Sequence, residues 1–207
     1  MTKSGNKPYH HGNLKNELID AALDILKKKG LVGLSLRELA INLGVSHGAP
    51  YRHFKNKSGL LEAIAVIGHQ NLVQIGNEAR QKNPTAPKQQ LFELGLNYIR
   101  YVSHNPEIAN LMFGGVLSLE NCGPELKQAS NDSISGLFAI IENGKQSGVF
   151  VNKDTKSLAL TTLATVHGLS MLIIGGILKD QVSSDIKLQT LVKGLYEILL
   201  NGLLIKR

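Results

Sequence analysis

Apolar residues recur along this chain at the three- and four-residue spacing of amphipathic helices, and no segment shows the convincing alternation of a half-buried strand. The pattern therefore predicts an all-α fold of about nine helices, most of them separated by Gly, Pro or Asn. The predicted helices cover residues 14–29, 36–43, 47–53, 57–82, 87–104, 106–113, 124–147, 155–178 and 184–205.

Signals for helix ends are clear around the second and third predicted helices. Ser35 and Glu38 have the spacing of a capping box, in which Ser35 accepts the Glu38 amide and the Glu38 side chain bonds back to the Ser35 amide. The second helix should then stop at Gly44. Ser46 is expected to cap the short third helix, and Pro50 falls near its first turn, where the missing N–H costs least.

The second and third predicted helices, joined by the tight turn Gly44-Val45-Ser46, fit a helix-turn-helix unit. Such a unit presents its second helix to the major groove of DNA. That helix is rich in hydrogen-bond donors and in small residues that allow close approach. The donors are His47, Tyr51, Arg52 and His53, and the small residues are Gly48 and Ala49.

Three aromatic positions of this unit have a second, purely structural interpretation. Phe54 is interpreted as a core residue. Tyr51 is interpreted as a half-buried ring whose hydroxyl reaches a phosphate, with a core position as the alternative. His53 is either a DNA contact or a structural histidine whose hydrogen bonds are satisfied within the fold.

Positive charge is concentrated in the same part of the chain. Residues 1–60 contain ten Lys or Arg and four Asp or Glu, whereas residues 61–207 contain thirteen and twelve, so the first third holds nearly all of the net charge of +7. Localised positive charge favours a polyanionic partner, because binding releases counterions from phosphates. A solvated basic face would give the same count.

Several other functions find no support in the sequence. We expect no enzyme, because no nucleophile elbow, phosphate-binding glycine loop, paired carboxylates or zinc-ligand spacing occurs, and we expect neither a cofactor nor a structural metal. The single cysteine, Cys122, cannot form an intramolecular disulfide, and residues 1–13 have no apolar signal-peptide core. The predicted location is therefore the cytoplasm.

Residues 157–178 carry no charge, and this stretch is about as long as the ~20 residues that cross a bilayer. It also contains three threonines, a histidine, two serines and three glycines, which favour a buried bundle helix over a membrane span. We expect no membrane partner.

The head of the chain resembles the tetracycline-repressor (TetR) family over roughly residues 13–65. The resemblance is carried by Leu36-Arg37-Glu38-Leu39-Ala40, Leu43-Gly44-Val45-Ser46, Tyr51-Arg52-His53-Phe54, Lys57 and Leu60-Leu61. The resemblance implies phosphate contacts for Arg37, Ser46, Tyr51, His53 and Lys57. It also implies that His47, Gly48, Ala49, Pro50 and Arg52 lie at or near base edges. Ser35 is also counted among the predicted DNA-binding residues.

A narrower resemblance points to a subgroup of that family whose C-terminal domain is marked by a Trp-His-Gly motif. It rests on Tyr9-His10-His11-Gly12-Asn13-Leu14 near the start and on His167-Gly168 in a later helix. Val166 stands where tryptophan would be expected.

The helices 155–178 and 184–205 each carry an apolar stripe, which suits a four-helix dimer interface or, alternatively, the core of one monomer. The resemblance favours the dimer, with Thr165, Leu172, Leu191, Leu195 and Leu199 as predicted interface residues. The resemblance also implies a pocket for an unknown small effector, with Tyr98, His104, Met112, His167 and Met171 as candidates. Each candidate is equally well explained as ordinary core.

The predicted organisation is a basic arm over 1–12, a helix-turn-helix DNA-binding domain over 13–60, and a ligand-binding and dimerisation domain over 61–207. The predicted function is a sequence-specific transcription regulator, by family default a repressor, that a small hydrophobic effector releases from a palindromic operator. The alternative is an architectural or recombination-type helix-turn-helix protein without an effector.

Overall fold

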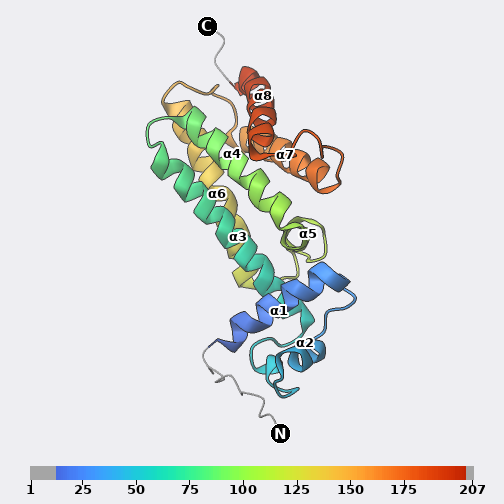
Figure 1. Cartoon of the computed structure of the whole chain (residues 1–207). Helices are drawn as coiled ribbons and strands as arrows, with labels where there is room; N and C mark the ends of the chain where they lie inside the picture. Colours follow the sequence, from blue (N-terminus) through green and yellow to red (C-terminus); the bar gives the residue numbers. More distant parts are fainter. Residues whose placement is uncertain (1–12, 204–207) are drawn as a thin grey trace. The chain divides into compact units, whose positions relative to one another are not determined.

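In a computed structural model (Figure 1), the described residues, 13–203, form eight α-helices, one 3-10 helix and no strand. The all-α prediction is therefore confirmed. The predicted arm 1–12 and the end of the last predicted helix lie outside the described residues. The helices are α1 Leu14–Lys29, α2 Leu36–Leu43, η1 Pro50–Arg52, α3 Lys57–Lys82, α4 Pro87–His104, α5 Pro106–Phe113, α6 Pro124–Gln146, α7 Thr155–Ile174 and α8 Asp185–Leu203.

The chain divides into two compact units, the first ending at Ile64 and the second beginning at Ala65. The first unit holds α1, α2, η1 and the start of α3. Its core is built from leucines that α1, α2 and α3 bury completely, namely Leu18, Leu39 and Leu60. The predicted boundary at residues 60–61 falls inside α3, close to this division.

Two helices differ from the predicted bounds by more than two residues at one end. The third is a single 3-10 turn rather than a helix over 47–53, because Pro50 has no N–H to donate to the Ser46 carbonyl and Gly48 disfavours helix. The predicted helix 155–178 ends at Ile174. There Gly176 adopts a φ of +77°, which favours glycine, and the Ile177 amide bonds back to the Leu172 carbonyl at 3.1 Å.

In the second unit α4 packs against α5, α6, α7 and α8, and α6 also packs against α7. The core at one end of these helices contains the fully buried side chains of Leu91, Ile140, Ile141 and Phe150. The helices α3 and α6 approach closely where Gly76 faces Gly136, since a Cβ on either glycine would lie within 4 Å of the Cα of the other.

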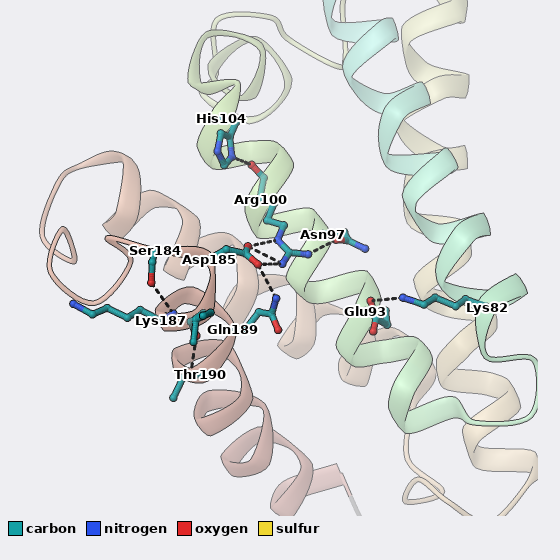
Figure 2. A network of polar contacts seen from close by, with 11 residues as sticks. Lys82, Glu93, Asn97, Arg100, His104, Ser184, Asp185, Lys187, Gln189 and Thr190 are labelled. Carbon is teal, nitrogen blue, oxygen red and sulfur yellow. Dashed lines mark hydrogen bonds and ion pairs between the residues drawn. The ribbon is translucent and has the colours of Figure 1, made fainter.

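Polar contacts fix α8 and α3 onto α4, as Figure 2 shows. Arg100 of α4 donates to both carboxylate oxygens of Asp185, the first residue of α8, at 2.7 and 2.8 Å. Lys82 at the end of α3 forms a longer ion pair with Glu93 of α4 at 3.8 Å. The first contact joins helices that are far apart in sequence, and the second joins two consecutive helices.

By length and composition α7 could cross a membrane, although core helices of soluble proteins pass the same test. Its side chains are unevenly covered. Leu158, Ala159 and Leu169 are buried, whereas Leu160 and Leu172 are 47% and 43% exposed. The helix thus buries one side in its own unit and leaves a second apolar side exposed.

Candidate nucleic-acid interface and ligand cavity

The start of α2 is fixed by Ser35, whose hydroxyl accepts the amide of Glu38 at 3.1 Å. This half of the predicted capping box is confirmed. The other half is wrong, because the Glu38 carboxylate pairs with Lys29 at 2.6 Å instead of the Ser35 amide. A charged donor within reach makes the stronger bond. The pair also joins the end of α1 to the start of α2.

The turn after α2 has the geometry of a Schellman motif. Gly44 lies in the left-handed region at φ +65°, its amide bonds to the Ile41 carbonyl at 3.1 Å, and the Val45 amide bonds to the Ala40 carbonyl at 3.0 Å. Any residue other than glycine would be strained at this φ. The turn therefore fixes the direction in which the chain leaves α2 for the third helix.

The segment after the turn is held by short-range bonds from Ala49 to the Ser46 carbonyl and from His53 to the Pro50 carbonyl, at 2.9 and 3.0 Å. Phe54 is only 4% exposed, so its predicted core position is confirmed. Tyr51 is 55% exposed, so the alternative that placed it in the core is wrong.

The surface of this segment is polar. The exposed residues of the predicted DNA-binding set are Ser35, Arg37, Ser46, His47, Gly48, Tyr51, Arg52 and His53, while Ala49 is half-buried. Pro50 is buried, so its ring offers no surface to a base. Within residues 13–203 the side chains of Arg37, His47, Tyr51 and Arg52 form no hydrogen bond or ion pair, which leaves their donors available to a partner outside the chain.

Lys57 has a structural contact that the sequence does not reveal. Its ammonium donates to the Leu31 carbonyl in the connection between α1 and α2, and the side chain is half-buried. An ammonium has three donors, so this contact is compatible with a phosphate contact. Lys57 therefore joins the start of α3 to the rest of the head.

The second unit contains a cavity of about 280 Å³ among α3, α4, α5, α6 and α7. Of the predicted pocket residues, Tyr98 lines it. His167 is not a lining residue, but its Nδ1 lies 2.9 Å from the Tyr98 hydroxyl. The His167 ring also packs on Phe113, another lining residue, at a centroid distance of 5.0 Å. Burial lowers the pKa of His167 and raises that of Tyr98, so both stay neutral at pH 7.

The other three pocket candidates lie elsewhere. His104 is exposed and lies 2.7 Å from the Arg100 carbonyl, Met171 is 39% exposed, and Met112 is buried without lining the cavity. The sequence analysis missed His69, a buried lining residue on α3, and also missed Val166 as a lining residue. Val166 occupies the position where the subgroup motif has tryptophan, and the subgroup assignment stays a prediction.

The predicted dimer residues fall into two environments. Leu172 is 43% exposed. Thr165, Leu195 and Leu199 are half-buried around a small apolar gap between α4, α7 and α8 of the same chain. Leu191 is also half-buried. Among these five residues, Leu172 offers the most surface to another molecule.

Comparison with known proteins agrees with the architecture of the head. Residues 18–64 match the family model of bacterial regulatory proteins of the tetR family. The tetracycline repressor protein class A from transposon 1721 of Escherichia coli is 52% identical over 50 residues, which are 24% of this chain and 23% of that protein. The curated relatives first found are thus matched over about a quarter of their own length.

Comparison with solved structures extends to the whole fold. A protein of unknown function from Rhodococcus sp. RHA1 is similar with a TM-score of 0.84 and 28% identity, over 97% of this chain and 100% of that one. The transcriptional regulator FadR from Bacillus subtilis, solved in complex with stearoyl-CoA, has a TM-score of 0.66 and 22% identity, over 90% of this chain and 98% of that one.

Proposed function

Since the chain belongs to the TetR family of bacterial regulatory proteins, we propose that it regulates transcription by binding a specific double-stranded DNA operator. It acts in the cytoplasm as a repressor rather than as an enzyme. The surface after the α2 turn supports this function most directly. There His47, Tyr51 and Arg52 are exposed, carry hydrogen-bond donors, and have no bond to their side chains within residues 13–203.

The contacts divide by chemistry. Phosphates position a protein on DNA, whereas base edges specify the sequence. His47 and Arg52, beside the small residues Gly48 and Ala49, are placed to read bases. The proposed phosphate contacts come from Arg37, Ser46, Tyr51, His53 and Lys57.

The active form is a homodimer joined through α7 and α8. Leu160, Leu172 and Ile198 are 47%, 43% and 71% exposed in one chain, and large apolar side chains in such numbers favour an interface. Gly168 of α7 and Gly194 of α8 are exposed, and a Cβ on either would meet nothing within 4 Å. Small residues of this kind let a helix of a second copy approach closely. An obligate interface would bury at least ~1,000 Å² in total.

A small, largely apolar effector in the cavity releases the operator. Helix α3 begins at Lys57 in the first unit, passes His69 on the cavity wall and ends at Lys82. A continuous helix with a ligand contact along its length can transmit a shift between the two units. Operator and effector must then weaken each other's binding by the same factor, typically about 5- to 150-fold, which corresponds to about 1–3 kcal/mol.

Selection from a random double-stranded DNA library with the full chain tests the DNA function. We expect one palindromic sequence whose half-site centres are about 10–10.5 base pairs apart. The affinity should fall steeply as salt rises, with a slope of roughly −5 to −7 for the logarithm of affinity against the logarithm of salt concentration. Arg52→Ala should change the selected sequence, whereas Tyr51→Phe should weaken all sequences alike. Binding to many unrelated sequences without an enriched palindrome would instead support the architectural alternative and overturn the regulator.

A further inference from the structure

Among the described residues, those that line the cavity in the second unit carry no charged side chain. The polar residues of this wall are serines, an asparagine, a threonine, Tyr98 and His69, and the remainder is apolar. A buried charged ligand group would lose its hydration there without a partner of opposite charge, which is strongly unfavourable. The composition of the wall therefore selects uncharged molecules.

His69 is the chemically unusual member of this wall. It is 2% exposed, and its Nδ1 lies 2.9 Å from the Ser133 hydroxyl on α6. The Ser133 hydroxyl also lies 2.8 Å from the Ser130 carbonyl, which can only accept, so Ser133 donates its single proton there. Both contacts are satisfied only when Nδ1 carries the proton of His69 and donates to Ser133. Nε2 is then an unprotonated acceptor.

This Nε2 has no hydrogen-bond partner within the described residues. Among the described residues, four buried side-chain nitrogen or oxygen atoms lack a hydrogen-bond partner. Of these four atoms, only His69 Nε2 belongs to a residue that lines the cavity. Leaving a buried acceptor without a donor is costly, so an incoming donor is favoured. Burial also lowers the pKa of His69 to about 4, which keeps the ring neutral at pH 7.

Phe113 packs against the imidazole of His69 at the cavity wall. Its ring meets that of His69 edge-on at a centroid distance of 5.8 Å, and it lines the same cavity. The side chain is 39% exposed and is the last residue of α5, so it can turn aside to admit a ligand to Nε2. The cavity volume of about 280 Å³ would accommodate a ligand of roughly ten non-hydrogen atoms at liquid density.

We propose that this cavity binds an uncharged, largely apolar molecule of that size that donates a hydroxyl or amide hydrogen bond to His69. The inference deepens the proposed regulatory function and rests on it for the consequence of binding. The binding chemistry itself rests on the wall, on the Ser130–Ser133–His69 chain of contacts, and on the unpartnered Nε2. An acyl chain ending in a carboxylate or a phosphate does not meet these requirements.

Isothermal titration of the full chain with three simple probes tests the proposal. 1-Octanol and heptyl methyl ether are isomers that differ in having or lacking a donor, and octanoate adds a charge. We expect 1-octanol to bind about 3- to 10-fold more tightly than the ether, as expected for one net hydrogen bond, and octanoate to bind more weakly than either. The isomer comparison uses the wild-type chain, so it does not depend on the folding of a variant.

His69→Leu should abolish the preference for the alcohol over the ether, whereas His104→Leu, the same change at an exposed histidine outside the cavity, should retain it. Equal affinity for the two isomers, tighter binding of octanoate, a preference that survives His69→Leu, or no binding of any probe would each overturn the proposal. DNA selection is independent of these titrations. A protein that binds its operator but fails them refutes only the ligand class, and one that passes them without binding DNA refutes only the regulator.

Discussion

Replacing Lys57 with methionine separates the structural contact of its side chain in the head from its proposed role in DNA binding. Methionine retains the length and most of the apolar contact of the lysine stem and removes the ammonium. The Leu31 carbonyl then loses the Lys57 donor at a partly buried position. Such a loss costs about 1–3 kcal/mol. For a protein of this length each kcal/mol lowers the melting temperature by about 2–4 °C.

The same change should alter DNA binding through charge. If Lys57 also contacts a phosphate, a dimer loses two such contacts. The log–log dependence of affinity on salt should then become less steep by about 2. The two effects are measured separately, the first by urea unfolding followed by circular dichroism and the second by operator titration at several salt concentrations.

Lys55→Met is the matched control, because Lys55 is exposed and its side chain has no bond within residues 13–203. It should leave the free energy of unfolding within ~0.5 kcal/mol of the wild type. If Lys57→Met unfolds at the same urea concentration as Lys55→Met, the Leu31 contact does not stabilise the head. If the salt dependence of operator binding by Lys57→Met is also the same as that of the wild type, Lys57 does not contact a phosphate.

Three further changes test the core, the interface and the buried histidine. Leu39→Ala leaves a cavity at a fully buried position of the head, so it should lower the free energy of unfolding by about 2–5 kcal/mol and abolish operator binding. Ile41→Ala, at a 62% exposed position, should have neither effect. Equilibrium unfolding and DNA titration measure the two effects. Leu172→Asp should give folded monomers by sedimentation. Leu119 is about equally exposed but lies outside α7 and α8, so Leu119→Asp should stay dimeric. A dimeric Leu172→Asp would contradict the proposed interface. Burial lowers the pKa of His69 to about 4. Between pH 6.5 and 4, His69 therefore binds fewer protons in the folded state than in the unfolded state. The free energy of unfolding should therefore fall by about 3 kcal/mol as pH falls through that window, and a pH dependence unchanged in His69→Leu would show that His69 is not the cause.

The helix bounds could be predicted where a strong apolar period meets a clear stop. The predicted segments 36–43, 87–104 and 106–113 match α2, α4 and α5, whose ends are set by Gly44 and by Pro87 and Pro106. The third helix could not be predicted as well. It is too short for periodicity to be informative, and the local effects of Gly48 and Pro50 outweigh the helical pattern around them.

The polar surface of the head was also accessible to prediction, because exposed donors on a short amphipathic segment are visible in the sequence. The contact between Lys57 and the Leu31 carbonyl was not, since it joins positions 26 residues apart through a backbone atom. The cavity was less accessible still. His69 and Ser133 are 64 residues apart, and a single histidine in a long helix gives no sign that it is buried. A pattern shows which side chains face inward but not where their packing leaves a gap.

The division of α7 into a covered and an open side illustrates the same limit and bears on the dimer. In an amphipathic helix, the charged residues on one side show that the opposite side is buried. Residues 157–178 carry no charge, so the sequence does not show which apolar side of α7 its own unit covers. The structure covers Leu158, Ala159 and Leu169 and exposes Leu160 and Leu172. A helix that is apolar on all sides is stable in water only when all sides are covered, and its own unit covers one. Because the open side combines large apolar side chains with the space around Gly168, it suits the proposed packing against a helix of a second copy.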